Sequence, residues 1–288
     1  MTRTIGNPLS WAAEATFGAG RTAAEATEAL RGHTDAPPEV RRLTNADLRT
    51  ALRRGIEDFG ALRSDVIFLI LIYPIIGIVL ALTAFHMARL PMFFPLAAGF
   101  TLLGPVVATG LYEMSRQREA TGKAGWGAAF SVIRAPVIVP VIVLGAVLMG
   151  LFLAWMFAAS VIYNVTLGPQ PPASIGGFLS DVLTTGPGWV MTVLGLGVGA
   201  VFAALTLALS LTAFPMLIDR RAGVMVAVLT SLRVVRENPR VSATWGLIVA
   251  VAMLLGTLPL FLGLVIVLPV LGHATWHLYR AAVPGETD

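Results

Sequence analysis

The sequence predicts an all-α, polytopic membrane protein with six transmembrane helices. Hydrophobic residues make up 56% of the chain and charged residues only 12%, about half the charged fraction usual in soluble domains. The apolar residues gather in charge-free runs long enough to cross a bilayer, and the basic residues lie almost entirely between those runs. Together these observations exclude a soluble globular domain.

Six apolar runs are long enough to be transmembrane helices, because a helix needs roughly 20 residues to cross about 30 Å of hydrocarbon. We expect spans at 66–85, 92–112, 136–163, 188–218, 241–258 and 259–279. The fifth and sixth spans belong to one apolar block, which only Gly256, Thr257, Leu258 and Pro259 divide.

The basic residues predict the orientation. Nineteen of the twenty Lys and Arg residues fall on one side of this arrangement, and Arg89 is the exception. Because Lys and Arg mark the side that is not translocated, we expect both termini in the cytoplasm. The same distribution accounts for the net charge of +4 without nucleic acid, so the expected partner is the lipid bilayer.

We divide the chain into an N-terminal cytoplasmic tail, an amphipathic surface helix, the transmembrane domain and a C-terminal cytoplasmic tail. These parts comprise residues 1–42, 43–64, 65–280 and 281–288. The N-terminal tail could itself contain an amphipathic helix. In the surface helix, a start near Asn45 places Leu48, Leu52, Ile56 and Phe59 on one face.

A weak internal repeat links the two basic loops between spans. Residues 124–134 align with residues 223–233, and each segment follows a span that ends in an acid and arginines. The surface helix at 43–62 occupies the same place before the first span. The predicted fold is therefore three quasi-repeated transmembrane hairpins, each preceded by a cytoplasmic surface helix.

Two of the four histidines, His273 and His277, lie four residues apart near the end of the last span. On a helix they share one face, the spacing that lets two imidazoles bind one metal ion. The predicted topology brings other polar residues to the same cytoplasmic interface: Asp65, Glu113, Asp219, Arg116 and Arg280. The alternative is that these acids form ion pairs with nearby arginines and that the histidines anchor the helix at the lipid headgroups.

Other chemistry is excluded or weakly indicated. The chain has no cysteine, which removes disulfides, thiolate metal sites and thiol nucleophiles. Gly195 and Gly199 form a GxxxG pattern inside an apolar span, which indicates close helix packing. We find no phosphate-binding or nucleophile-elbow motif, so we assign no catalytic or cofactor-binding residue and expect no cofactor.

The segments LAAGFTLLGP (96–105) and GHATWHLYR (272–280), with DLRTALRRGIEDF (47–59), resemble a bacterial family of uncharacterised integral membrane proteins, domain-of-unknown-function family 2189. The resemblance covers most of the chain from about Leu43 onward. It implies six spans in the bacterial inner membrane and no established activity.

Three functions are compatible with these features. The first is a non-catalytic accessory or scaffold component that binds other membrane-protein subunits or lipids, favoured by apolar spans without a charge at their centre. The second is a transporter or channel for a small uncharged or lipid-like solute, and the third is a metal-binding membrane enzyme that uses His273 and His277. The balance favours a protein that is not an enzyme.

Overall fold

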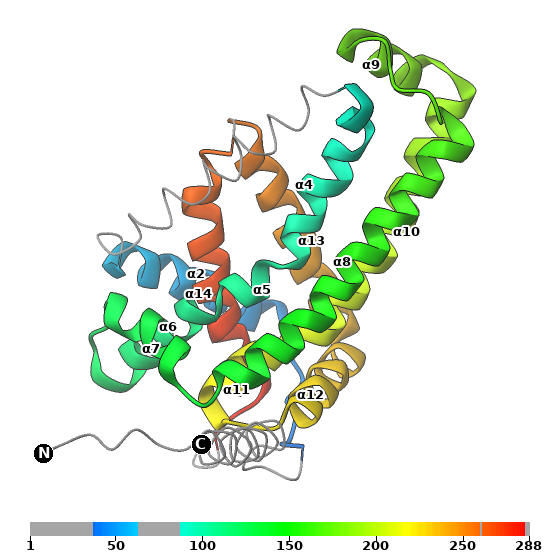
Figure 1. The fold of residues 1–288 in the computed structure, drawn as a ribbon. Helices are drawn as coiled ribbons and strands as arrows, with labels where there is room; N and C mark the ends of the chain where they lie inside the picture. Colours follow the sequence, from blue (N-terminus) through cyan, green and yellow to red (C-terminus); the bar gives the residue numbers. More distant parts are fainter. Residues whose placement is uncertain (1–36, 63–86, 260, 286–288) are drawn as a thin grey trace, which may run out of the picture.

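The computed structural model describes residues 37–62, 87–259 and 261–285, and within these ranges the elements are helices. The longest are α8 (Ile138–Thr166) and α10 (Gly186–Ser210), which lie side by side as a hairpin (Figure 1). The short helix α9 (Ile175–Thr184) closes this hairpin at one end. Side chains cap both returning helices: Ser174 accepts a hydrogen bond from Gly177 N at the start of α9, and Thr185 accepts one from Gly188 N at the start of α10.

The other end of the hairpin meets a group of shorter helices, which we call the base. It contains α2 (Asn45–Leu62), α6 (Thr109–Thr121), α7 (Trp126–Arg134), α11 (Ala213–Arg220), α12 (Val224–Glu237) and the C-terminal half of α14 (Leu264–Ala282) (Figure 1). Most of the largest fully buried side chains belong to these helices, and the adjoining α13 (Pro239–Thr257) adds Trp245. The hydrophobic core therefore lies at the base, whereas the hairpin projects away from it.

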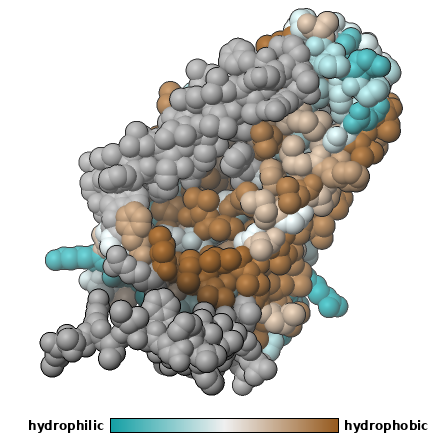
Figure 2. Space-filling model, in the orientation of Figure 1, coloured by the Kyte–Doolittle hydropathy of each residue, from teal (hydrophilic) through white to brown (hydrophobic). Residues whose placement is uncertain are grey.

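Three helices are long and apolar enough to cross a membrane: Ile138–Thr166, Gly186–Arg220 and Pro239–Thr257. They correspond to the third, fourth and fifth predicted spans. Within the described part of the chain, only 6% of the most apolar window of Gly186–Arg220 is buried, so this helix lies largely at the surface of the molecule. Figure 2 shows the resulting apolar band along the hairpin, with polar residues gathered at the α9 end.

The other predicted spans differ from expectation. The first, 66–85, lies outside the described residues. The second, 92–112, is wrong as one continuous helix: it is divided into α4 (Phe93–Leu102), α5 (Gly104–Val107) and the start of α6, after a 3-10 helix at Met87–Met92. Pro105 explains one break, because it lacks an amide hydrogen and restricts the residue before it. The sixth span begins later than predicted, at Leu264, and six spans are not established.

The helix predicted at the start of the surface segment is confirmed as α2, with a different cap. Thr44 Oγ1 accepts a hydrogen bond from Asp47 N at 3.3 Å, and Asp47 Oδ2 accepts one from Thr44 N at 2.8 Å. This reciprocal pair is a capping box, so Thr44 rather than Asn45 is the N-cap residue of the helix. α2 then packs against α14 so closely that a Cβ atom on Gly55 would lie 2.7 Å from the backbone of Ala274.

The helices α2, α7 and α12 share a burial pattern that supports the predicted repeat. Each buries an alanine, buries the residue four positions later and exposes a large apolar residue five positions later. The alanines are Ala51, Ala128 and Ala227, and the exposed residues are Ile56, Ile133 and Leu232. Each helix thus presents a small-residue face to the base and an apolar edge outward.

Candidate functional site

The polar half of α14 is enclosed by α2 and α6. His273 is fully buried, the side chain of His277 is 10% exposed, and Trp276 and Tyr279 are also fully buried. Anchoring of this helix end among lipid headgroups was the simpler prediction, and it is wrong because these side chains lie in the protein core. The stretch GHATWHLYR is the polar centre of the base.

Asp58 of α2 connects the two histidines to α6. Its Oδ2 lies 2.9 Å from His277 Nε2 and accepts a hydrogen bond from Ser115 Oγ at 2.6 Å. Arg118 Nη1 donates to the other oxygen, Oδ1. Ser115 Oγ also lies 2.8 Å from Nδ1 of His273, which completes a continuous polar network across three helices. We call these five residues the Asp58 network.

The geometry of the Asp58 network fixes where its protons lie. The hydroxyl of Ser115 has one proton, which it donates to the carboxylate of Asp58, so its oxygen accepts from an N–H at Nδ1 of His273. An ionised carboxylate only accepts, so Nε2 of His277 donates to Asp58. The remaining ring nitrogens, Nε2 of His273 and Nδ1 of His277, find no hydrogen-bond partner among the described residues.

Asp58 is held in its ionised form inside the base. Burial opposes ionisation most strongly, but the hydrogen bonds from His277 and Ser115 outweigh it, so the pKa of Asp58 lies below its usual value. A buried carboxylate with three donors is a strong connection between helices, because removing any donor would leave charge or polarity uncompensated. Ser115 is only 1% exposed, so it cannot act as a nucleophile toward an external substrate.

A second set of contacts surrounds Arg280, the last charged residue of α14. Its Nε lies 3.3 Å from Glu119 Oε1, and its Nη1 lies 3.6 Å from Asp219 Oδ2. The same two acids accept hydrogen bonds from fully buried aromatic residues, Glu119 from the indole of Trp276 at 2.9 Å and Asp219 from the hydroxyl of Tyr279 at 2.7 Å. One arginine thus ties α6 and α11 to the end of α14.

The polar residues predicted at the cytoplasmic interface take part in separate contacts. Asp65 lies outside the described residues. Glu113 and Arg116 form an ion pair within α6, with 2.7 Å between Oε1 and Nη2. The hydrogen bonds that Arg116 donates to Glu113 are the largest influence on its guanidinium and raise its pKa, although burial opposes the charge. The acids therefore pair with arginines, as the alternative interpretation expected, and Asp219 does so with Arg280.

The predicted glycine pair lies on α10. A Cβ atom on Gly199 would lie 3.1 Å from the indole of Trp155 on α8, whereas one on Gly195 would meet nothing within 4 Å. Gly199 therefore permits close packing within the hairpin, whereas Gly195 makes no such contact with the described residues.

Metal binding by His273 and His277 stays a prediction. Within the described part of the chain, no group of three or more His, Cys, Asp or Glu side chains is arranged to hold a metal ion. In each ring, one nitrogen is hydrogen-bonded within the Asp58 network, and the other has no hydrogen-bond partner among the described residues. Metal analysis of the purified protein tests this prediction directly.

Sequence reasoning missed Asp58, Ser115, Arg118 and Glu119. Asp58 connects the members of the network. The sequence pattern that could have identified Asp58 is the stripe of Leu48, Ala51, Gly55 and Asp58 along α2. Two of these residues are small, which allows close approach of another helix. An acid on the same stripe then has to meet a partner on that helix.

The fold and this site define a helical integral membrane protein with a buried polar base. Residues 93–219, from α4 to α11, match the family described as predicted integral membrane protein (DUF2189). The resemblance to this family that the sequence predicted is confirmed over these residues. Comparison with curated proteins and with solved structures finds no match for the chain.

Proposed function

We propose that the protein is a non-catalytic accessory or scaffold component of a membrane complex. The observation that supports this most directly is the unpartnered outer face of α10. Gly197, Ala200 and Ala204 are exposed on it, and a Cβ atom on Gly197 would meet nothing within 4 Å. Small residues are typical of helix–helix contacts in membranes because they let backbones approach closely.

The Asp58 network is also better suited to holding helices than to catalysis. Its charges are neutralised inside the base, and its hydroxyl is inaccessible. A subunit that presents one helical surface to a partner is expected to combine a well-packed base with an exposed apolar hairpin.

We further propose six spans in the bacterial inner membrane with both ends in the cytoplasm. Arg41 N donates a hydrogen bond to Ala282 O at 2.8 Å, so the segment before α2 and the end of α14 lie side by side. Both therefore belong to the same side of the membrane. The basic residues of α2, α6 and α12 gather at this base, which supports a cytoplasmic location.

Affinity purification of the tagged full-length chain from its native membrane in mild detergent tests the accessory role. Mass spectrometry should find a partner in fixed proportion, and metal content should be read from the same sample. Gly197→Leu should abolish co-purification, whereas Gly195→Leu, also in open space but on another side of α10, should retain it. A protein recovered alone would contradict the proposal.

A transporter or channel for a small uncharged or lipid-like solute is the second candidate. The interruption of α4, α5 and α6 favours it, because broken helices at membrane depth occur where backbone is buried or lines a cavity. Fluorescent phospholipid in proteoliposomes provides a test. Exchange between leaflets no faster than in protein-free vesicles would argue against lipid-like solutes, and solute-driven swelling assays cover the uncharged ones.

A further inference from the structure

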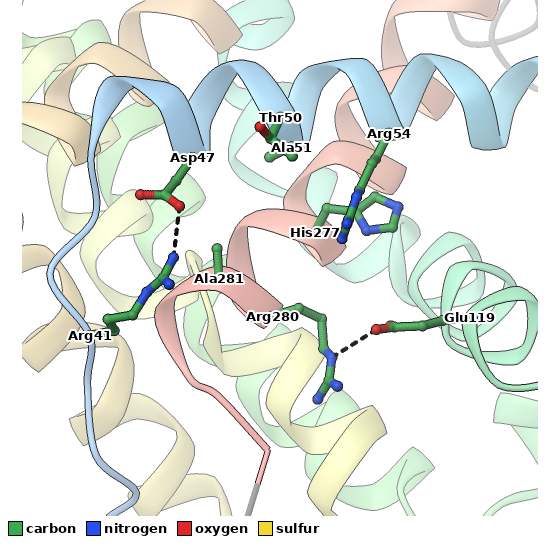
Figure 3. A pocket seen from close by; sticks show the side chains of 9 residues that line it. All are labelled: Arg41, Asp47, Thr50, Ala51, Arg54, Glu119, His277, Arg280 and Ala281. Atoms are coloured by element: carbon green, nitrogen blue, oxygen red, sulfur yellow. Dashed lines mark hydrogen bonds and ion pairs between the residues drawn. The ribbon is translucent and has the colours of Figure 1, made fainter. Parts of the chain in front are cut away.

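A cavity of about 270 Å³ opens between α2 and the end of α14 (Figure 3). Asp47, Thr50, Ala51 and Arg54 line it from α2, whereas His277, Arg280 and Ala281 line it from α14. Arg41 and Glu119 complete the wall. Its volume lies below the range of about 300–1,000 Å³ usual for drug-sized ligands, so it fits a small ion or headgroup.

The carboxylates of the two acids that line this cavity already accept hydrogen bonds from neighbouring side chains. Asp47 accepts hydrogen bonds from Arg41 Nη2 at 2.7 Å and from the hydroxyl of Thr44 at 2.7 Å. Glu119 accepts from Trp276 and Arg280. Neither acid therefore has a free charge with which to attract a cation.

The basic side of the cavity is less fully used. Arg54 has no ion-pair partner among the described residues, and its guanidinium lies beside the ring of His277 (Figure 3). Arg41 forms its ion pair with Asp47 through one terminal nitrogen, which leaves other N–H groups of its five donors. The cavity thus combines an uncompensated cation with spare donors from a second arginine.

His277 provides an independent indication of a ligand. Its side chain is nine-tenths buried and lines the cavity, Nε2 is fixed by Asp58, and Nδ1 has no partner among the described residues. A buried polar atom without a partner is uncommon in proteins and calls for a water, an ion or a ligand group.

We propose that this cavity binds a phosphate group, presented by a lipid headgroup or by a soluble phosphate monoester. Phosphate matches the planar N–H forks of Arg54 and Arg41. The cavity lies at the base, which the proposed topology places at the cytoplasmic membrane surface, within reach of either source. The phosphate site does not depend on the accessory role.

Binding of inorganic phosphate to the purified full-length protein in detergent is the direct test, measured by isothermal titration calorimetry. Arg54→Gln should weaken binding about tenfold or more, because charge-assisted hydrogen bonds to phosphate are lost. Arg49→Gln is the matched control: it removes the same charge from an exposed position of α2 outside the cavity and should change affinity less than about twofold. Thr50→Phe, which fills the cavity without changing its charge, should also abolish binding.

Nanodiscs then identify the source of the phosphate. If phosphatidic acid in a phosphatidylcholine nanodisc displaces inorganic phosphate and plain phosphatidylcholine does not, the ligand is a lipid headgroup. If only glycerol 3-phosphate competes, the ligand is a soluble monoester. Absence of binding by all of these probes, or equal weakening by Arg54→Gln and Arg49→Gln, would overturn the proposal.

Discussion

Replacing Asp58 with Asn should loosen α2 from α6 and α14 while preserving the shape of the side chain. Asn retains one acceptor oxygen but presents an NH₂ group in place of the other, so the charge opposite Arg118 and at least one hydrogen bond are lost. Removing one partner of a buried ion pair costs about 3–5 kcal/mol. Because Asp58 is 7% exposed but Arg118 is 30% exposed and can regain water, we expect the lower end, about 3 kcal/mol of unfolding free energy.

Thermal unfolding in detergent measures this loss, which corresponds to a decrease of about 6–12 °C for a chain of this size. A local readout is also available because the chain has no cysteine: Ala51→Cys places one thiol at a position that is only 2% exposed between α2 and α14. Alkylation of this thiol should be faster when Asp58→Asn is added.

Glu57→Gln is the control for this experiment. It removes the same charge from a neighbouring side chain that is 57% exposed and whose contact with Arg53 is 3.9 Å, so its effect should stay within about 0.5 kcal/mol. If Asp58→Asn lowers the unfolding temperature no more than Glu57→Gln, the Asp58 network does not hold α2 in place.

Three further predictions follow from individual positions. Gly55→Val should lower the free energy of unfolding by about 1–3 kcal/mol through its clash with the α14 backbone, whereas Gly60→Ala, which meets nothing within 4 Å, should be neutral or slightly stabilising in the same thermal assay. Because its pKa is lowered on folding, Asp58 should stabilise the protein fully above its unfolded value of 3.8, and this contribution should disappear as pH falls through the lower folded pKa. Acid titration should show that Asp58→Asn removes this loss. Gly199→Leu should destabilise the hairpin by crowding the α8 indole, and Gly195→Leu should not, as limited proteolysis will show.

The apolar runs were sufficient to predict the helices that lipid or a buried core would stabilise. The third, fourth and fifth spans were predicted within a few residues of their observed ends, because each is long and free of charge. The second span failed for a local reason: Pro105 lies at one of its breaks, although its hydropathy is high. Hydropathy measures preference for lipid and carries no information about backbone continuity.

The packing face of α2 shows why the site was less predictable. The strongest apolar stripe, Leu48, Leu52, Ile56 and Phe59, was predicted as the apolar face of a surface helix, and Ile56 on it is 58% exposed. The face against α14 instead includes Ala51, Gly55 and Asp58. Close approach of two helices favours small residues, and an acid can be buried only when donors on the neighbouring helices meet it.

The sequence by itself determined that this is a helical membrane protein, that it resembles the DUF2189 family, where its long apolar segments lie and which of its residues are basic. Hydrophobic transfer and the charge distribution act along the chain, so they can be read from the order of residues. Only the tertiary structure decided that Asp58 meets His277, 219 positions away, and that α2 and α14 form a cavity between them. Those contacts depend on which helix faces pack together, and that choice follows from shape and paired polar groups across the whole base.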